Sequence, residues 1–474
     1  MPRKFCFALA AFVLTLSLVS QAQTIQRLAR QSPGGCGIDF LLTDGTVMCQ
    51  GNSESDWYKL TPDNTGSYVN GTWSKLASLP SGYVPDAFAS AVLADGRLII
   101  EGGEYNNGQF ALTNQGAIYD PAKNTWTTVA PPKGWNYIGD SPSVVLPNGN
   151  YLVGNKLTKS MALLNPATMK WSVLPGTGKS DFNAEEGWTL LADGTVLTMD
   201  VKHAPNSEKL STKNVWSTAG STIVDLHSPS PFGCINYGPG GSLCYYPPGE
   251  IGPAILRPDG TVFATGSYST AGPGHTAIYN TATGTWTAGP DFPNNDDAGD
   301  SFAALLPNGN VLVEAESSTS YVWDGTKLTA GPSTPGSLLI LPTGQVLVGG
   351  AEVYTATGTY KAAWAPTITT SPSSVTRGTT YPISGTQFNG LSQAAAFGDE
   401  FETATNYPLV RITNTATGHV FYAKTHGHST MGVATGAAKV STNFDAPKTM
   451  ETGPSTLTVV ANGIPSAAVS ITVN

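Results

Sequence analysis

One pattern recurs along most of the chain and restricts its fold more than any other feature. A short apolar run is followed by Asp-Gly, Asn-Gly or Thr-Gly, and then by a second apolar run. Such a pair between two apolar runs is typical of a β-hairpin, because the glycine adopts the positive φ that the turn requires. Seven copies occur, spaced 35 to 66 residues apart, and their turn glycines are Gly45, Gly96, Gly149, Gly194, Gly260, Gly309 and Gly344.

A second hairpin follows most copies of the first. It carries Tyr or Leu and, seven positions later, Trp, as in Tyr119 and Trp126 or Tyr279 and Trp286. Two hairpins per repeat of about 50 residues are typical of four-stranded β-propeller blades of kelch type. We therefore predict an all-β chain with a seven-bladed kelch-type propeller over residues 23–365 and an insertion near residues 225–249. The repeated tryptophans are expected in the core between blades: Trp73, Trp126, Trp171, Trp216 and Trp286.

The pattern stops near Pro366, and the chain becomes rich in Thr and Ser. Apolar and polar residues alternate there in six or seven short segments, among them 409–413 and 457–461. That many strands in about 110 residues are typical of an immunoglobulin-like sandwich. We therefore predict a second domain over residues 366–474.

The first 22 residues have the features of a secretory signal peptide. Arg3 and Lys4 precede an apolar run from Phe5 to Val19, and Ser20-Gln21-Ala22 has small residues where a signal peptidase cuts. The run is short for a spanning helix, which needs ~20 residues. We expect cleavage after Ala22, no membrane span in the mature chain, and a secreted protein, either extracellular or periplasmic.

Cysteine usage agrees with an oxidising compartment. Cys36, Cys49, Cys234 and Cys244 remain after removal of the signal peptide, and they form an even set without a zinc-binding spacing. Each pair brackets a turn, which favours Cys36–Cys49 and Cys234–Cys244 disulfides, although four cysteines allow three connectivities.

The charge balance excludes one class of partner. The chain has 33 acidic and 24 basic residues, giving a formal net charge of −9. Binding a phosphate backbone requires a basic face, so we do not expect nucleic acid as a partner.

The seven repeats followed by this C-terminal segment, which ends in 459–473, resemble the galactose oxidase and glyoxal oxidase group. That resemblance implies a propeller with a C-terminal domain and, in active members, a copper site of two tyrosines, one cross-linked to cysteine, and two histidines. In the group these ligands lie nine or ten residues before the turn of their blades and in a C-terminal loop. Here no Tyr-His pair exists, Cys36 lacks an equivalent tyrosine partner, and the matching loop, 397–403, has no histidine. We therefore do not expect copper.

Carboxylates occupy the positions where the family holds its metal ligands. If the blades are related by rotation, these acids surround one mouth of the central channel. Such a ring must be solvated, protonated, hydrogen-bonded or neutralised by a cation. Three interpretations stay open: caps for strand ends, a site for a ligand or a divalent cation such as Ca²⁺ or Mg²⁺, and an acid–base pair acting on a glycosidic bond. The acids are Asp86, Asp140, Glu185, Glu186, Glu250, Asp300, Asp399, Glu400 and Glu402.

Two further sets of residues are candidates. Trp135 and Tyr137 precede Asp140, and aromatic rings beside carboxylates suit sugar binding, although blade packing also explains them. His426 and His428 form a His-x-His pair that suits either a metal or a polar loop.

The function expected from these residues is the binding of an extracellular ligand, either a carbohydrate or a cell-surface partner, at the acidic channel mouth. A divalent cation such as calcium fits the same site. The alternative is a secreted carbohydrate-active enzyme, which would be an oxidase with non-standard ligands or a carboxylate-based hydrolase or lyase. A structural surface protein is a third class.

Overall fold

The structure is a computed structural model that describes residues 23–229, 233–236, 242–245, 249–268 and 272–474. In these ranges the protein is nearly all β, and helical structure is limited to two short 3-10 segments, η2 (Pro293–Asn295) and η3 (Ala362–Trp364). No helix in the described part of the chain is both long and apolar enough to cross a membrane.

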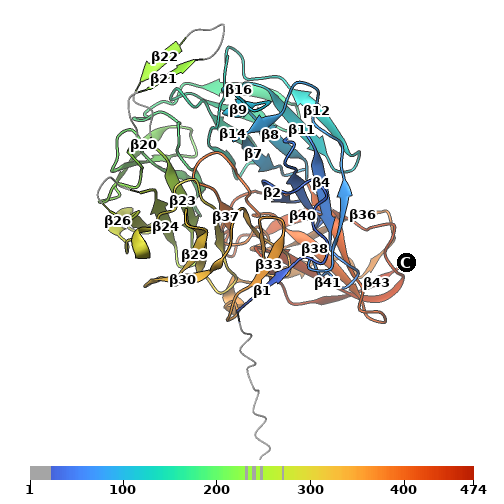
Figure 1. The fold of residues 1–474 in the computed structure, drawn as a ribbon. Coiled ribbons are helices and arrows are strands. Elements are labelled where there is room, and N and C mark those ends of the chain that lie inside the picture. The colour runs from blue at the N-terminus through green and yellow to red at the C-terminus, as the bar shows by residue number, and fades with distance from the viewer. Residues whose placement is uncertain (1–22, 230–232, 237–241, 246–248, 269–271) are drawn as a thin grey trace, which may run out of the picture.

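Seven antiparallel sheets of the described chain follow the predicted repeats (Figure 1). Six of them contain two hairpins each, and the seventh has one hairpin with further strands beside it, as expected for a β-propeller. In chain order the strands are β2 (Asp39–Leu41), β3 (Val47–Gln50), β4 (Trp57–Thr61) and β5 (Thr72–Lys75); β7 (Ala89–Val92), β8 (Leu98–Glu101), β11 (Gly116–Asp120) and β12 (Thr125–Val129); β13 (Ser143–Val145), β14 (Tyr151–Gly154), β15 (Met161–Asn165) and β16 (Lys170–Leu174); β17 (Thr189–Leu190), β18 (Val196–Met199), β19 (Asn206–Leu210) and β20 (Trp216–Ser221); β23 (Ile251–Leu256), β24 (Thr261–Gly266), β25 (Thr276–Asn280) and β26 (Thr285–Ala288); β27 (Ala303–Leu305), β28 (Val311–Glu314), β29 (Thr319–Trp323) and β30 (Leu328–Ser333); and β31 (Leu338–Ile340), β32 (Val346–Val348), β33 (Glu352–Thr355) and β1 (Thr24–Arg27).

The last of these sheets joins distant parts of the chain. Its outer strand is β1, which pairs with β33 in a register that sets Thr24 opposite Thr355. Two smaller sheets lie outside the repeat, one of β6 (Pro85–Asp86), β9 (Tyr105–Asn106) and β10 (Gln109–Phe110), and one of β21 (Gly233–Asn236) and β22 (Ser242–Tyr245).

The predicted hairpin turns are all present. The seven turn glycines have φ between 75° and 87°, and in each turn the left-handed conformation is confined to the glycine. In the first turn, Gly45 N donates to Leu42 O at 2.9 Å and Leu42 N donates to Thr46 O at 2.8 Å. This is a type I turn closed by a glycine bulge rather than a two-residue turn.

The repeated Tyr/Leu to Trp spacing places the two residues opposite each other. Tyr119 pairs with Trp126 across β11 and β12, and Tyr279 pairs with Trp286 across β25 and β26. The indole N–H then donates to the preceding sheet or its connection, as from Trp126 Nε1 to Ala77 O at 3.1 Å and from Trp286 Nε1 to Ser207 Oγ at 2.8 Å. The tryptophans therefore connect neighbouring sheets, as predicted.

The C-terminal strands form their own sheet system with a separate apolar core. Strand β39 pairs with β38 through its first half and with β40 through its second half, so that it belongs to two sheets. The strand order is β34 (Thr367–Thr370), β36 (Thr380–Thr386), β40 (Val440–Asp445), β39 (Val420–His426), β38 (Leu409–Asn414), β41 (Gly453–Ala461), β43 (Val469–Val473) and β35 (Ser374–Val375), with β42 (Ile464–Pro465) paired to β41.

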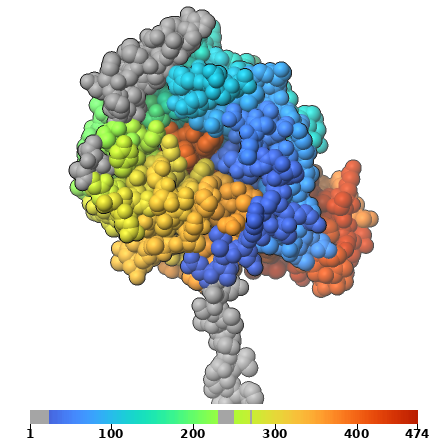
Figure 2. Space-filling model, viewed as in Figure 1, coloured from blue at the N-terminus to red at the C-terminus, as the bar shows by residue number. Residues whose placement is uncertain are grey.

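One segment of the C-terminal region enters the ring of sheets. Strand β37 (Ala395–Ala396) pairs antiparallel with β27, the inner strand of the sixth repeat, and lies at the centre of the ring (Figure 1). Because β27 runs toward its turn, β37 runs the opposite way and carries residues 397–402 toward the start of the inner strands. The orange-red atoms at the centre of the face in Figure 2 belong to this C-terminal region.

Both predicted cysteine pairs lie across hairpins or turns. Cys36 and Cys49 form a disulfide. The backbone of Cys234 pairs with that of Cys244 across β21 and β22, and the side chains of this pair lie outside the described part of the structure.

The inserted segment is held by aromatic rings. Phe302, which precedes β27, has its ring centroid 4.7 Å from that of Phe397, and Phe401 contacts Phe88 edge-on at 5.0 Å. Replacing Phe302 with Ala should lower the free energy of unfolding by about 3–5 kcal/mol, because it leaves a cavity beneath the segment. Denaturant unfolding monitored by fluorescence measures this loss.

Phe110 provides the matched control, since it lies on the exposed strand β10. Phe110→Ala should change stability by less than about 0.5 kcal/mol. Equal losses in the two variants would show that the inserted segment is not part of the folded core.

Candidate functional site

Three predicted carboxylates meet at the start of the inner strands. Asp140 precedes β13, Glu185 precedes β17, and Asp399 follows β37 in the inserted segment. One carboxylate oxygen of each lies within 4.8 Å of the others. The repeat thus brings two of these side chains to one mouth of the channel, and the C-terminal region brings the third.

A buried lysine lies among these acids. Lys156, two residues after β14, has its ammonium ion-paired with Asp140 Oδ2 and with Glu185 Oε1, the latter at 2.7 Å. All three side chains are almost fully buried. A buried ammonium needs such partners, because burial alone strongly disfavours its charge.

Four more carboxylates surround this centre, and we call the eight residues together the acidic mouth. The pKa of each additional carboxyl is shifted by at least one residue of the centre, which consists of Asp140, Glu185, Asp399 and Lys156. The additional carboxyls are Glu104, Glu250, Asp300 and Glu400. They come from the second, fifth and sixth repeats and from the inserted segment. Seven carboxyl groups therefore face one lysine.

The pKa values of these groups are spread widely. Burial raises the pKa of Glu250 to about 10, that of Glu400 to about 8 and that of Asp300 to about 6, and the neighbouring acids contribute to each shift. Burial and Glu400 together hold the pKa of Asp399 well above its usual value. Burial also opposes ionisation of Glu185, but Lys156 and a hydrogen bond with Asp399 lower the pKa of Glu185 below its ordinary value. Ionised and protonated carboxyls therefore lie side by side.

Two oxygens in the centre are left without partners. Asp140 and Asp399 are 4% and 8% exposed, and neither Oδ1 atom has a hydrogen-bond partner among the described residues. A buried polar atom without a partner costs free energy unless a ligand, ion or water satisfies it. The centre thus offers two oxygens for an additional group.

The backbone of two members of the acidic mouth is left-handed. Glu185 has φ 53° and Asp300 has φ 46°, which side chains other than glycine seldom adopt. Conformations of this kind persist only where the surrounding structure imposes them, and they gather at functional sites.

Three predicted acids lie apart from the acidic mouth. Asp86 is exposed and accepts a hydrogen bond from Ala87 N. Glu186 turns away from Glu185 and binds Lys179 Nζ at 2.7 Å, and Glu402 accepts hydrogen bonds from Gln393 Nε2 and Ala404 N. Each of these three carboxylates binds a donor outside the acidic mouth.

The predicted aromatic residues are placed unequally. Trp135 packs in the main core and does not present its ring to solvent, whereas Tyr137 is half-buried. Tyr105 was not predicted, yet it is 38% exposed, and the adjacent Glu104 raises the pKa of the Tyr105 hydroxyl. Tyr105 is therefore an exposed aromatic side chain next to the acidic mouth.

Glu104 and Lys156 were also missed by the sequence reasoning. In an antiparallel hairpin the end of the second strand lies beside the start of the first. Glu104 and Lys156 follow β8 and β14, the second strands of their repeats, so they reach the same mouth as Asp140. Reading both strand ends in register would have found them.

The predicted histidine pair does not form a common site. His426 Nε2 lies 3.1 Å from Asp445 Oδ1, and His428 Nδ1 lies 2.9 Å from Thr442 Oγ1. Burial lowers the pKa of His428 to about 3. Within the described chain, neither histidine belongs to a group of three metal-ligating side chains.

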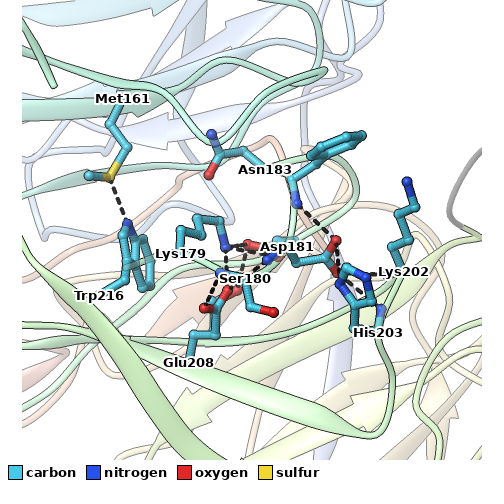
Figure 3. Close-up of polar contacts among 12 residues, drawn as sticks. Met161, Lys179, Ser180, Asp181, Asn183, Lys202, His203, Glu208 and Trp216 are labelled. Atoms are coloured by element: carbon cyan, nitrogen blue, oxygen red, sulfur yellow. Dashed lines mark hydrogen bonds and ion pairs between the residues drawn. The ribbon is translucent and has the colours of Figure 1, made fainter. Parts of the chain in front are cut away.

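A second buried ion cluster is centred on Lys179 (Figure 3). Lys179 Nζ binds both oxygens of Glu186 and also Glu208 Oε2 at 3.0 Å. The same ammonium lies 4.5 Å from the centre of the Trp216 ring. Glu185 and Glu186 are adjacent in sequence but point into two different clusters.

Comparisons with known proteins agree with the fold. No family model matches the chain. The kelch-like protein terF of Aspergillus terreus is 22% identical over 265 residues, which cover 52% of this chain and 54% of that protein. The chain thus spans about half the length of the curated relative that it matches. This match supports a kelch-type β-propeller.

Two solved structures are similar to the chain, each with a TM-score below 0.5. A fungal alcohol oxidase of the AA5 family in complex with copper aligns over 96% of this chain and all of its own, with 12% identity and a TM-score of 0.48. Virginiamycin B lyase from Staphylococcus aureus aligns over 70% of this chain and 98% of its own, with 11% identity and a TM-score of 0.46. We draw no activity from these likenesses.

The copper ligands implied by the family resemblance have no match at the acidic mouth. The group formed by Asp140, Glu185 and Asp399 contains only carboxylates. Cys36 is bonded to Cys49. The donor set is therefore hard oxygen, which does not suit a redox copper centre.

The role of Lys156 can be tested by removing its charge. Lys156→Met should lower the free energy of unfolding by about 3–5 kcal/mol at pH 8, because the buried carboxylates lose their cation. Lys156 holds the pKa of Glu185 down against burial, so its removal lets burial raise that pKa above the unfolded-state value. A carboxyl with a raised folded-state pKa destabilises the fold above its unfolded-state pKa, and this cost falls as pH falls. The loss should therefore be smaller at pH 5, where the acids of the variant take up protons. Denaturant unfolding of both proteins at pH 8 and at pH 5 measures the loss in free energy of unfolding at each pH.

Lys123→Met is the control for this change, since Lys123 forms an exposed ion pair with Asp120. It should cost less than about 1 kcal/mol at either pH. A Lys156→Met variant as stable as Lys123→Met would contradict the ionic role of Lys156.

Proposed function

We propose that the protein is a secreted seven-bladed kelch-type propeller with an immunoglobulin-like C-terminal domain. The seven sheets with their repeated turns support the blade number, and the separate C-terminal core supports the second domain. The signal-peptide pattern of residues 1–22 and the Cys36–Cys49 disulfide support secretion.

We propose further that the acidic mouth binds Ca²⁺ and, with it, a hydroxyl-rich ligand of carbohydrate type. The observation that carries this proposal is the pair of unpartnered oxygens, Asp140 Oδ1 and Asp399 Oδ1, at the buried centre. Calcium takes six to eight oxygen ligands and commonly keeps positions open for water or ligand hydroxyls. Burial holds the pKa values of Glu250, Glu400 and Asp399 high, so these carboxyls favour their protonated forms, and a bound cation would displace their protons.

The carbohydrate part of the proposal rests on an exposed aromatic residue, Tyr105, beside the acidic mouth. Tyr105 is exposed beside Glu104 and forms an edge-on pair with Phe110, with ring centroids 6.2 Å apart. An exposed aromatic ring next to carboxylates combines a stacking face with acceptors for sugar hydroxyls.

A second candidate function uses the same carboxyls as catalysts. Asp399 favours its protonated form and Glu185 its ionised form, and their oxygens lie within 4.8 Å of each other. A neighbouring acid and base of this kind can give a proton to a substrate and take one from it. Glycosidases hold such a pair about 5–5.5 Å apart or more, so the two side chains would have to separate around a glycosidic bond. Cleavage of a bound glycan would distinguish this function from binding alone.

Calcium binding is tested first with the ion alone. Isothermal titration of the chelator-treated protein with Ca²⁺ should show saturable binding. The double variant Asp140→Asn with Glu185→Gln should weaken that binding by at least about tenfold, because two charged oxygen ligands become neutral.

Asp193→Asn is the matched control, since Asp193 caps the turn between β17 and β18 at the opposite end of the strands from Glu185. It should bind Ca²⁺ like the unchanged protein. Calcium binding that is equal in all three proteins, or absent from the unchanged one, would refute the proposed cation site.

The carbohydrate ligand is tested on a glycan array. The unchanged protein should bind a subset of glycans in Ca²⁺ and lose that binding in EDTA, and Tyr105→Ala should lower the signal without changing Ca²⁺ affinity. Calcium binding without any glycan signal would reject the carbohydrate ligand and leave the cation site standing.

A further inference from the structure

A second group of metal-ligating side chains lies in the fourth repeat, outside the acidic mouth. Asp181 belongs to the connection that leads into β17, whereas Asp200 and His203 belong to the connection between β18 and β19. Figure 3 shows Asp181 beside His203. One ligand atom of each lies within 4.8 Å of the others. This group shares no residue with the acidic mouth.

The Asp181 carboxylate is fixed in place by backbone donors. Its Oδ1 accepts a hydrogen bond from Phe182 N at 2.8 Å, and its Oδ2 accepts from Lys202 N at 2.8 Å and from His203 N at 3.3 Å. These bonds join the two connections and orient Asp181 toward His203, whose Nδ1 lies 3.4 Å from Asp181 Oδ1. A ligand held in this way loses little freedom when an ion binds.

Asp200 is the member of the group that receives no hydrogen bond, and its carboxylate also lies within 4.8 Å of ligand oxygens of Glu186 and Glu208. It is 3% exposed, and neither carboxylate oxygen has a hydrogen-bond partner among the described residues. Burial, followed by the charge of Glu208, raises the pKa of Asp200 to about 8. A buried carboxylate in this position calls for a cation or a proton.

Lys179 is close enough to lower the pKa of Asp200, but its ammonium forms its ion pairs with other carboxylates. Lys179 is already bound by Glu186 and Glu208 and lies over Trp216. Lys202 places its ammonium 4.4 Å from the centre of the Phe182 ring, and Figure 3 shows its side chain directed away from the cluster.

We propose that Asp181, Asp200 and His203 bind a divalent transition-metal ion of the Zn²⁺ type. Two carboxylates and one imidazole are ligands that Zn²⁺ uses, whereas Ca²⁺ prefers oxygen alone. The His203 side chain is 47% exposed, so the ion has a route from solvent and positions for water. The bound ion would hold the β18–β19 connection against the segment that carries Glu185.

Zinc binding to the full-length mature protein tests this site. The protein is prepared without a histidine tag, treated with chelator and titrated calorimetrically with Zn²⁺. One equivalent should bind, and His203→Ala and Asp200→Asn should each weaken the affinity by at least about tenfold, because each removes a ligand from a site of three. X-ray absorption at the zinc edge should show one imidazole, which His203→Ala should remove.

His275→Ala is the matched control, since His275 also pairs with an aspartate, Asp291, at 2.7 Å but belongs to no three-ligand group in the described chain. It should leave zinc affinity unchanged, and circular dichroism should show that all variants fold. Absence of stoichiometric Zn²⁺ binding, or equal affinity in His203→Ala and His275→Ala, would overturn the proposal.

Two controls separate this site from the calcium site. Asp140→Asn with Glu185→Gln should keep zinc affinity, and His203→Ala should keep calcium affinity. Loss of zinc binding in the Asp140/Glu185 variant would place the zinc ion at the acidic mouth and would also overturn the proposal.

Discussion

A buried ammonium among carboxylates is the interaction on which the candidate site depends. Lys156 binds Asp140 and Glu185 directly, and these residues come from two neighbouring repeats. Without the lysine the acids could not share one buried space in ionised form, because like charges that close repel one another strongly in a medium of low polarity. The lysine pairs with only two of the carboxyls. Burial keeps others protonated, and a further cation would take the place of those protons.

Antiparallel geometry explains why the charges meet. Each repeat brings the start of its inner strand and the end of its second strand to the same mouth, so Asp140 and Lys156 are contributed by one hairpin. The inserted strand β37 runs against β27 and adds Asp399 and Glu400 to that mouth. The C-terminal region therefore completes the site.

Much of the fold could be predicted from the sequence, because turn glycines and the Tyr/Leu to Trp spacing are local patterns that translate directly into hairpins and cross-strand pairs. The start of the inner strand was likewise a readable position, and Asp140, Glu185, Glu250 and Asp300 do gather there. The direction of each side chain was not readable. Glu185 and Glu186 enter different clusters, and the backbone at Glu185 is left-handed, which no local sequence pattern indicated.

The partners of the acids were missed for two different reasons. Glu104 and Lys156 follow the second strands of their repeats, and reading those strand ends in register would have found them. The group of Asp181, Asp200 and His203 depends on a contact between two connections, which no local pattern indicated. Charge counting along the chain found an acidic excess but could not show that one lysine is buried within it. The sequence left both sugar binding and blade packing open for Trp135, and its ring packs in the core.

A crystal structure of the protein grown in Ca²⁺ would test the central claim most directly. A calcium ion should lie about 2.3–2.6 Å from carboxylate oxygens of Asp140 and Asp399, with water or ligand oxygens completing its shell. A structure at saturating Ca²⁺ in which those oxygens bind only water or the Lys156 ammonium would contradict the proposed site.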